Sequence, residues 1–196
     1  MGENMEYFEE QEIKDQQYED QSFENFEFVE CNFTKCQFLN IKLTNCKFKN
    51  CKFNNCVIGN VKFLYSEAKN LEFTNSVLIG IIWNDLKNKG IETAIFRSMK
   101  SCTIKYNYFT NLKLVKYDFS GSQFDESYFE ECKLTDAKFN GVNLHGTKFI
   151  KCDLSGADFR DALEYEIDIA DNKLKKAKFS FPEVISLLSS LNIIID

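Results

Sequence analysis

The chain has 196 residues, a formal net charge of −6 and 15% aromatic residues. It has no run of about eighteen apolar residues, which a membrane-spanning helix would need. Its acidic start also lacks the basic and apolar segments of a secretory signal peptide. We therefore expect a soluble, cytoplasmic protein with no membrane partner.

Residues 1–20 are predicted to be an acidic N-terminal lead-in. Residues 1–30 carry eleven acidic side chains against one base, Lys14. Phe8, Ile13 and Tyr18 are spaced five residues apart, which is compatible with a leading strand. A partly disordered segment or an acidic arm that contacts a partner remain alternatives.

From residue 21 onwards a large apolar residue recurs at every fifth position. Between residues 21 and 83 twelve of thirteen such positions are large and apolar, and Ala68 is the exception. After an interruption the spacing resumes one residue out of phase, from Ile104 to Phe159, and then continues more weakly to Phe179 with a failure at Glu164. A period of five fits neither a helix nor a simple strand. It indicates a structural repeat in which each unit contacts only its neighbours.

The blocks SGADF (155–159) and GVNLHGTKF (141–149) carry the pattern A(D/N)LXX and resemble the pentapeptide-repeat family. This resemblance implies an all-β fold, a right-handed quadrilateral parallel β-helix over residues 21–179. Four repeats would make one coil, with the central residue of each repeat and the residue two places earlier pointing inward. The fifth place of the first run is Asn or Gly in nine of thirteen blocks. Both residues tolerate the positive φ of a tight corner.

The eight cysteines all lie two places before a central residue, which places them inside the coil. There a cysteine behaves as a small apolar residue, and the C-x4-C spacing lacks the C-x2-C pair of zinc sites. We expect reduced thiols and no metal or cofactor. The cysteines are Cys31, Cys36, Cys46, Cys51, Cys56, Cys102, Cys132 and Cys152.

Residues 84–98 break both the spacing and its phase. They are expected either to project as a loop or to form an irregular corner in which Ile91, Ile95 and Phe96 keep the core closed. Irregular segments on rigid scaffolds are frequently functional.

No pattern in the sequence supports catalysis. His145 is the only histidine, and it follows a central residue and so should face solvent. Without an inward or paired histidine, Ser-His and Cys-His mechanisms lack a base, and no phosphate-binding glycine motif is present. The chain is predicted not to be an enzyme.

Residues 180–196 leave the five-residue frame and are predicted to form a short C-terminal α-helix and a terminal strand at Ile193–Ile195. Pro182 and Glu183 suit the first turn of a helix. The segment would cap the open end of the coil, and its surplus of apolar residues predicts a homodimer. The expected dimer interface is Phe181, Val184, Ile185, Leu188, Leu191, Ile193 and Ile195.

This ending also resembles the C-terminal region of quinolone-resistance (Qnr-type) pentapeptide-repeat proteins. The resemblance implies a dimeric rod that imitates B-DNA, binds DNA gyrase or topoisomerase IV and modulates quinolone sensitivity. Residues 122–171 carry a net charge of −7 over about 12 Å of stacked strands, where B-DNA would present about seven charges. The expected partner-binding surface is Asp125, Glu126, Glu130, Glu131, Asp136, Asp153, Asp158, Asp161, Glu166, Asp168 and Asp171.

Two other classes of function remain open from the residues. One is a scaffold or protein-interaction β-helix without a topoisomerase partner. The other is nucleic-acid binding through residues 31–116, of which residues 31–70 hold seven lysines and one acid. This basic stretch lacks arginine clusters and is expected to lack outward aromatic residues, so no direct nucleic-acid binding is expected.

Overall fold

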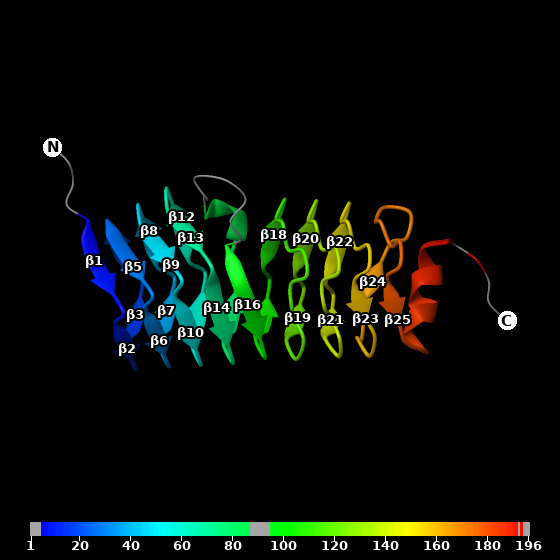
Figure 1. The fold of residues 1–196 in the computed structure, drawn as a ribbon, viewed down its shortest axis with the longest axis horizontal. Coiled ribbons are helices and arrows are strands. Elements are labelled where there is room, and N and C mark those ends of the chain that lie inside the picture. The colour runs from blue at the N-terminus through cyan, green and yellow to red at the C-terminus, as the bar shows by residue number, and fades with distance from the viewer. Residues whose placement is uncertain (1–4, 87–94, 192, 194–196) are drawn as a thin grey trace.

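The computed structural model describes residues 5–86, 95–191 and 193, and these form a parallel β-solenoid of about eight turns (Figure 1). Each turn of the chain has four sides formed by short strands or isolated bridges, and most strands pair in parallel with the strand twenty residues later, as β1 does with β5 and β2 with β6. The rod therefore has four faces, with the N-terminus at one end and the C-terminus at the other (Figure 1). The predicted all-β solenoid is confirmed.

The four faces are numbered by the order in which the chain visits them. Face one contains β1 (Glu6–Glu9), β5 (Phe26–Val29), β9 (Lys47–Lys49) and β13 (Glu67–Lys69). Face two contains β2 (Glu12–Lys14), β6 (Asn32–Thr34), β10 (Lys52–Asn54), β14 (Leu71–Thr74), β16 (Phe96–Lys100), β23 (Asp158–Phe159) and β25 (Lys178–Phe179).

Face three contains β3 (Gln17–Glu19), β7 (Gln37–Leu39), β11 (Val57–Gly59), β15 (Val77–Ile79), β17 (Thr103–Lys105), β19 (Gln123–Asp125) and β21 (Asn143–His145). Face four contains β4 (Ser22–Glu24), β8 (Lys42–Thr44), β12 (Lys62–Leu64), β18 (Tyr108–Thr110), β20 (Tyr128–Glu130), β22 (Lys148–Ile150) and β24 (Glu166–Ile167). Two 3₁₀ helices complete the described elements, η1 (Trp83–Asp85) and η2 (Glu183–Leu191).

The first coil begins earlier than the sequence analysis places it. Residues 1–20 were predicted to be a lead-in, but β1, β2 and β3 form three sides of a complete coil, with Phe8, Ile13 and Tyr18 pairing with Phe28, Phe33 and Phe38 of the next. The acidic outward residues do not interfere, because a strand needs only every second side chain to face the core. The repeat region therefore starts within the predicted lead-in.

The corners of the coil confirm the role predicted for the fifth place of each repeat. Asn40, Asn45 and Asn50 have φ of 53°, 51° and 55°, in the left-handed region. Side-chain amides also link successive corners, as Asn45 Nδ2 donates to Asn25 Oδ1 at 2.6 Å. Asparagine therefore both tolerates the corner and joins it to its neighbour.

The one-residue change of phase is a β-bulge at Arg97. Leu71 pairs with Phe96 and Glu72 pairs with Ser98, so Arg97 is an extra residue in β16. The structure begins the irregular interval with η1 and ends it with the buried Ile95 and Phe96. Ile91, which was expected to help close the core, lies outside the described residues.

A second irregularity lies near Glu164, where the five-residue spacing fails. Lys148 pairs with Glu166, only eighteen residues later, so the corner before β24 is two residues short, and the spacing of twenty is restored where Asp153 bridges to Lys173. As a result Ile167 takes the inward position and is 3% exposed. The five-residue spacing that resumes at Ile104 would place Ile169 at this position, and that expectation is wrong because the shortened corner moves the chain inward two residues earlier.

The C-terminal segment forms a 3₁₀ helix rather than the predicted α-helix. With three residues per turn, Val184 and Leu187 lie on one stripe and pack toward the last coil. The hydroxyl of Ser186 donates to the carbonyl of Tyr165 at 3.3 Å and fixes the helix on that coil. The predicted strand at Ile193–Ile195 lies largely outside the described residues.

Candidate partner-binding surface

The inward polar side chains of the rod serve the scaffold, so the charged and exposed side chains that could contact a protein partner are sought on the outer faces and at the ends. All eight cysteines are buried, as predicted, and their thiols reach backbone carbonyls of the preceding coil, such as Cys132 Sγ to Phe109 O at 3.1 Å. Serine takes the same role at Ser76, whose hydroxyl donates to Phe53 O at 3.2 Å. These inward polar groups supply hydrogen-bond donors to buried backbone carbonyls, and their role is therefore structural.

Six of the eleven predicted acidic residues gather on face four and at the corners that flank it. All six are exposed, and we call this group the face-four acidic patch. It consists of Glu126, Glu130, Glu131, Glu166, Asp168 and Asp171.

The other five predicted acidic residues are distributed around the rod. Asp136 and Asp161 occupy corners on either side of face two, and Asp153 and Asp125 are half-buried on faces one and three. Asp125 also pairs with Lys105 at 3.1 Å. The structure therefore places about half of the predicted acidic residues along face four, where one of them, Glu166, pairs with Lys148.

Asp158, predicted to belong to the acidic surface, is largely buried. It lies on face two with only 8% of the residue exposed, and its carboxylate accepts bonds from Arg160 Nη2 at 2.6 Å and Nε at 2.8 Å. This hydrogen-bonded guanidinium holds the pKa of Asp158 well below its usual range. The structure therefore pairs Asp158 with Arg160 and does not gather it with the exposed acidic residues.

Glu164 adds an acidic side chain that the sequence analysis did not assign to the surface. Its carboxylate accepts a bond from Asn143 Nδ2 at 2.8 Å and lies 2.7 Å from Nδ1 of the exposed His145. The hydrogen bond from Asn143, followed by the contact with His145, lowers the pKa of Glu164. The failure of the five-residue spacing at Glu164 was the available signal, because a side chain that leaves the core has to face outward.

A second feature of face four is an exposed aromatic and aliphatic patch near the middle of the rod. Tyr108 and Tyr128 stack with ring centroids 5.0 Å apart and an angle of 3° between the rings. Ile82 bridges to Tyr108, which continues face four between β12 and β18. We call this group the face-four aromatic patch, and it consists of Leu64, Tyr65, Ile82, Tyr106, Tyr108 and Tyr128.

The sequence analysis missed the aromatic patch because it treated aromatic residues mainly as core candidates. The signal was present, since these tyrosines fall at outward or corner positions of the frame. Tyr65 is 74% exposed, so the statement that residues 31–70 lack outward aromatic residues is wrong. Exposed tyrosines are enriched at protein interfaces, where one ring offers both apolar area and a hydroxyl.

The C-terminal end of the rod exposes the apolar stripe of η2 that faces away from the last coil. Ile185 and Leu191 are 46% and 45% exposed, and Leu188 between them is half-buried. Phe181 and Ile193 are also exposed, at 81% and 53%. Of the other predicted interface residues, Val184 packs on the core, and Ile195 lies outside the described residues.

Other kinds of site have little support in the described part of the chain. Across residues 5–86, 95–191 and 193, no three His, Cys, Asp or Glu side chains gather as a metal site. Within the same residues no helix has the length and apolar character required to cross a membrane.

Comparison with known proteins shows both the repeat and the fold. A family model of pentapeptide repeats matches eight copies within residues 19–50, 108–141 and 127–163. Full-length QnrB1, described as a plasmid-mediated fluoroquinolone resistance protein, is 18% identical, with a TM-score of 0.53 over 95% of this chain and 100% of that chain. A trypsin-treated QnrB1 variant is 16% identical, with a TM-score of 0.50 over 96% and 99%.

HetL, a pentapeptide repeat protein involved in heterocyst differentiation regulation from the cyanobacterium Nostoc sp. strain PCC 7120, is 12% identical. Its TM-score is 0.44 over 87% of this chain and 86% of that chain. Among curated proteins no sequence matches this chain.

Proposed function

Because this chain is a pentapeptide-repeat protein, we propose that it is a non-enzymatic binding rod that engages DNA gyrase or topoisomerase IV and thereby modulates quinolone sensitivity. The observation that carries the proposal is the face-four acidic patch, which lies toward the C-terminal end of a solenoid that matches the whole length of QnrB1. An enzyme that holds DNA through basic side chains can accept a protein surface that presents a similar line of negative charge.

The position of the acidic patch favours a dimer as the active form. Residues 122–171 carry twelve acids against five bases, a net charge of −7, and they directly precede the C-terminal end of the rod. A two-fold contact through the η2 stripe would bring two acidic patches together about one centre. The pair would present a longer acidic surface than one chain can.

The test is a supercoiling assay with purified gyrase, with and without ciprofloxacin, in which the protein is titrated. We expect the protein to change supercoiling or its sensitivity to the drug. Glu126→Gln/Glu130→Gln/Glu131→Gln should reduce this effect at least tenfold, since it removes three charges from the patch.

The matched control is Glu6→Gln/Glu9→Gln/Glu10→Gln, which removes three exposed charges from the first coil and should leave the effect unchanged. No effect of the unmodified protein on gyrase or topoisomerase IV at micromolar concentration would contradict the proposal. Equal loss in both triple variants would show a dependence on net charge alone and would also contradict it.

The face-four aromatic patch favours a second candidate function, a scaffold that binds another protein without any topoisomerase. Three of its members, Tyr65, Tyr106 and Tyr108, are between 44% and 74% exposed, although large aromatic side chains gain free energy when buried. In this case Tyr108→Ser should abolish binding of the protein partner. The variant Glu126→Gln/Glu130→Gln/Glu131→Gln should still bind it. The two candidate functions therefore respond to different substitutions on the same face.

A further inference from the structure

The interior of the rod is hollow in its N-terminal half. A cavity of about 620 Å³ begins at the first coil, where the exposed Gln11 and Gln16 border it, and extends to Trp83 and Leu86. Between these ends its wall is formed by inward phenylalanine rings. The volume lies within the range of pockets that bind small molecules.

The exposure of several inward residues agrees with the cavity. Phe38, Phe48 and Phe63 remain half-buried although coils cover them on both sides, whereas Phe109 and Phe129 in the C-terminal half are 0% exposed. Phe33, Phe53 and Phe73 also line the cavity but are buried, so the open space lies mainly beside the half-buried rings.

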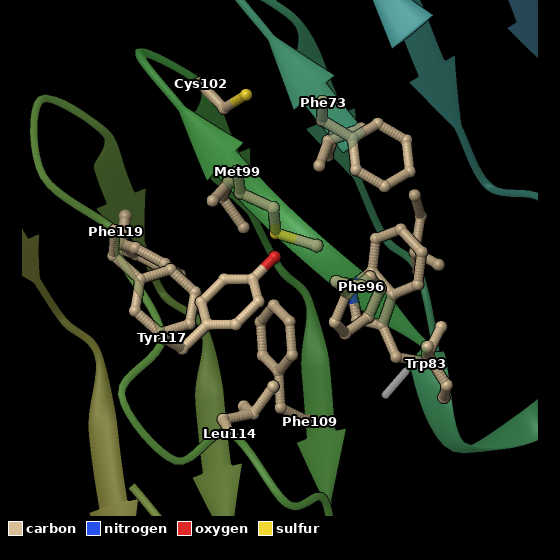
Figure 2. Close-up of a cluster of buried hydrophobic side chains, with 14 of the residues drawn as sticks. Phe73, Trp83, Phe96, Met99, Cys102, Phe109, Leu114, Tyr117 and Phe119 are labelled. Atoms are coloured by element: carbon tan, nitrogen blue, oxygen red, sulfur yellow. The ribbon is translucent and has the colours of Figure 1, made fainter. Parts of the chain in front are cut away.

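A closely packed cluster forms the floor of this space. Trp83 packs edge-on against Phe96 with ring centroids 4.6 Å apart, and its indole nitrogen donates to Asn107 Oδ1 at 2.9 Å. Figure 2 shows Met99, Tyr117 and Phe109 filling the interior beside these rings, and the sulfur of Met99 lies toward the hydroxyl of Tyr117. The cavity is therefore closed at Trp83 and opens at the first coil.

The shape and the lining define the ligand. Three coil spacings separate Ile13 from Phe73 on face two, both of which line the cavity, or about 14 Å, which an extended chain of about twelve bonds would span. The walls offer apolar contacts but few hydrogen-bonding groups, so the inserted part has to be an unbranched hydrocarbon.

The charge at the mouth defines the other end of the ligand. Residues 1–30 carry a net charge of −10, and Lys14, their only base, lies 3.7 Å from Glu12, which also borders the cavity. This field repels a carboxylate headgroup and attracts a cation. We propose that the N-terminal cavity binds one linear alkyl ammonium molecule, with the chain along the axis and the positive headgroup at the acidic first coil.

Trp83 provides a direct test, because it is the only tryptophan of the chain and lies at the floor. A dodecyltrimethylammonium probe with bromine on its terminal carbon should quench the fluorescence of Trp83 and saturate at one equivalent, below its micelle concentration. The absence of quenching would overturn the proposal. Equal binding of dodecanoate, measured by calorimetry, would overturn the assignment of a cationic ligand.

A pair of identical substitutions separates binding in the cavity from binding at the surface. Leu43→Phe adds a ring inside the cavity between Phe23 and Phe63, whereas Leu163→Phe adds the same ring outside the coil, where Leu163 is 45% exposed. Leu43→Phe should weaken binding at least tenfold, and Leu163→Phe should leave it unchanged. Unchanged binding in Leu43→Phe would overturn the proposal.

Thermal unfolding then distinguishes a filled cavity from a damaged core. Leu43→Phe should keep or raise the melting temperature, while Leu144→Phe, at a position that is 0% exposed in the filled half, should lower it. Glu12→Gln should weaken binding of the ammonium probe roughly two- to fivefold. A loss of stability in Leu43→Phe as large as that in Leu144→Phe would show that no cavity exists at this place.

Discussion

At the scale of single residues, each repeat divides its inward positions between packing and hydrogen bonding. The central residue fills the coil, and the residue two places earlier supplies a small donor to a carbonyl of the coil before it, as Cys152 does to Phe129 O at 3.2 Å. Asn172 does the same through Nδ2 to Phe149 O at 2.9 Å. Cys, Ser and Asn are therefore interchangeable at this position as far as the hydrogen bond is concerned.

The cost of removing a central phenylalanine should depend on the half of the rod in which it lies. Phe129→Ala removes a ring that is 0% exposed and should lower the free energy of unfolding by about 3–5 kcal/mol. Phe48→Ala should cost clearly less, because its ring already borders the N-terminal cavity. Urea denaturation of both variants checks this, and equal losses would contradict a hollow N-terminal half.

The buried thiols predict how stability depends on alkaline pH. Burial raises the pKa of Cys51 to about 12 and the pKa of Cys102 to about 11, above the value of about 8.5 in an unfolded chain. Below about pH 8.5 the thiols are protonated in both the folded and the unfolded chain, so the free energy of unfolding does not depend on their titration. Above this pH the unfolded chain releases protons first, so the free energy of unfolding should fall as the pH rises from about 8.5 to about 12.

The control for this prediction is Cys51→Ser, which keeps a donor to the same carbonyl but does not titrate in this range. The variant should lose less stability between pH 8.5 and pH 11 than the unmodified protein.

The buried thiols also predict the rate of chemical labelling. The thiols of the folded protein should react slowly with a labelling reagent, and all of them should react after unfolding. Rapid labelling of most native cysteines would contradict the buried positions.

At the scale of elements, the repeat tolerates irregular segments where the extra residues leave the register of later coils intact. The bulge at Arg97 is such a case, because the pairing of Phe73 with Met99 is regular again two residues later. The short corner at Glu164 is another, because Asp153 still bridges to Lys173 after the normal twenty residues. Each irregularity is confined to about one side of one coil.

Deletion of Arg97 should therefore be tolerated. The deletion removes the bulge and leaves Phe96 and Ser98 in their register. It also removes an exposed ion pair between Arg97 and Glu72 at 3.5 Å, which contributes no more than about 1 kcal/mol to the free energy of unfolding. Deletion of Asn54 in β10, where no bulge exists, should unfold the protein because the following residues exchange inward and outward positions. Circular dichroism melting curves compare the two, and a destabilised Arg97 deletion would contradict the interpretation as a bulge.

The elements also show how far the sequence determines this structure. The five-residue period predicted a structural repeat, and the resemblance to pentapeptide-repeat proteins added the β-solenoid, from which the inward cysteines and the corners follow. It could not predict that η2 is a 3₁₀ helix, since apolar residues such as Val184 and Leu187 fit spacings of both three and four. It also could not predict the gathering of acids on face four, because the short corner at Glu164 changes which later residues share a face.

At the scale of the whole molecule, the rod has two unlike ends. The N-terminal coil borders the cavity with polar residues such as Gln11 and Gln16, each of which folds its side-chain amide onto a backbone carbonyl at 2.8 Å. The C-terminal end is covered by η2, whose outer stripe is apolar. Polar terminal repeats oppose stacking of rods, so of the described residues those at the C-terminal end are better suited to self-association.

The dimer prediction follows from this difference between the ends. Leu188 lies in the middle of the outer stripe, and each such leucine contributes roughly 1.5–3 kcal/mol when it becomes fully buried. Leu188→Asp should therefore give a folded monomer, while Ser189→Asp on an adjacent stripe should remain dimeric. Sedimentation velocity at micromolar concentration decides this, and an unmodified protein that sediments as a monomer would contradict it.

The direction of the backbone hydrogen bonds has a mechanical consequence. Most of them join residues about twenty apart, as between Asn40 N and Gly59 O at 2.9 Å, so they run along the rod, and the two termini lie at its opposite ends (Figure 1). A load applied through the termini pulls on these bonds in line and peels the coils away one at a time. Each coil that detaches adds about 70 Å of extended chain. Under tension the rod would therefore lengthen in equal steps of one coil each.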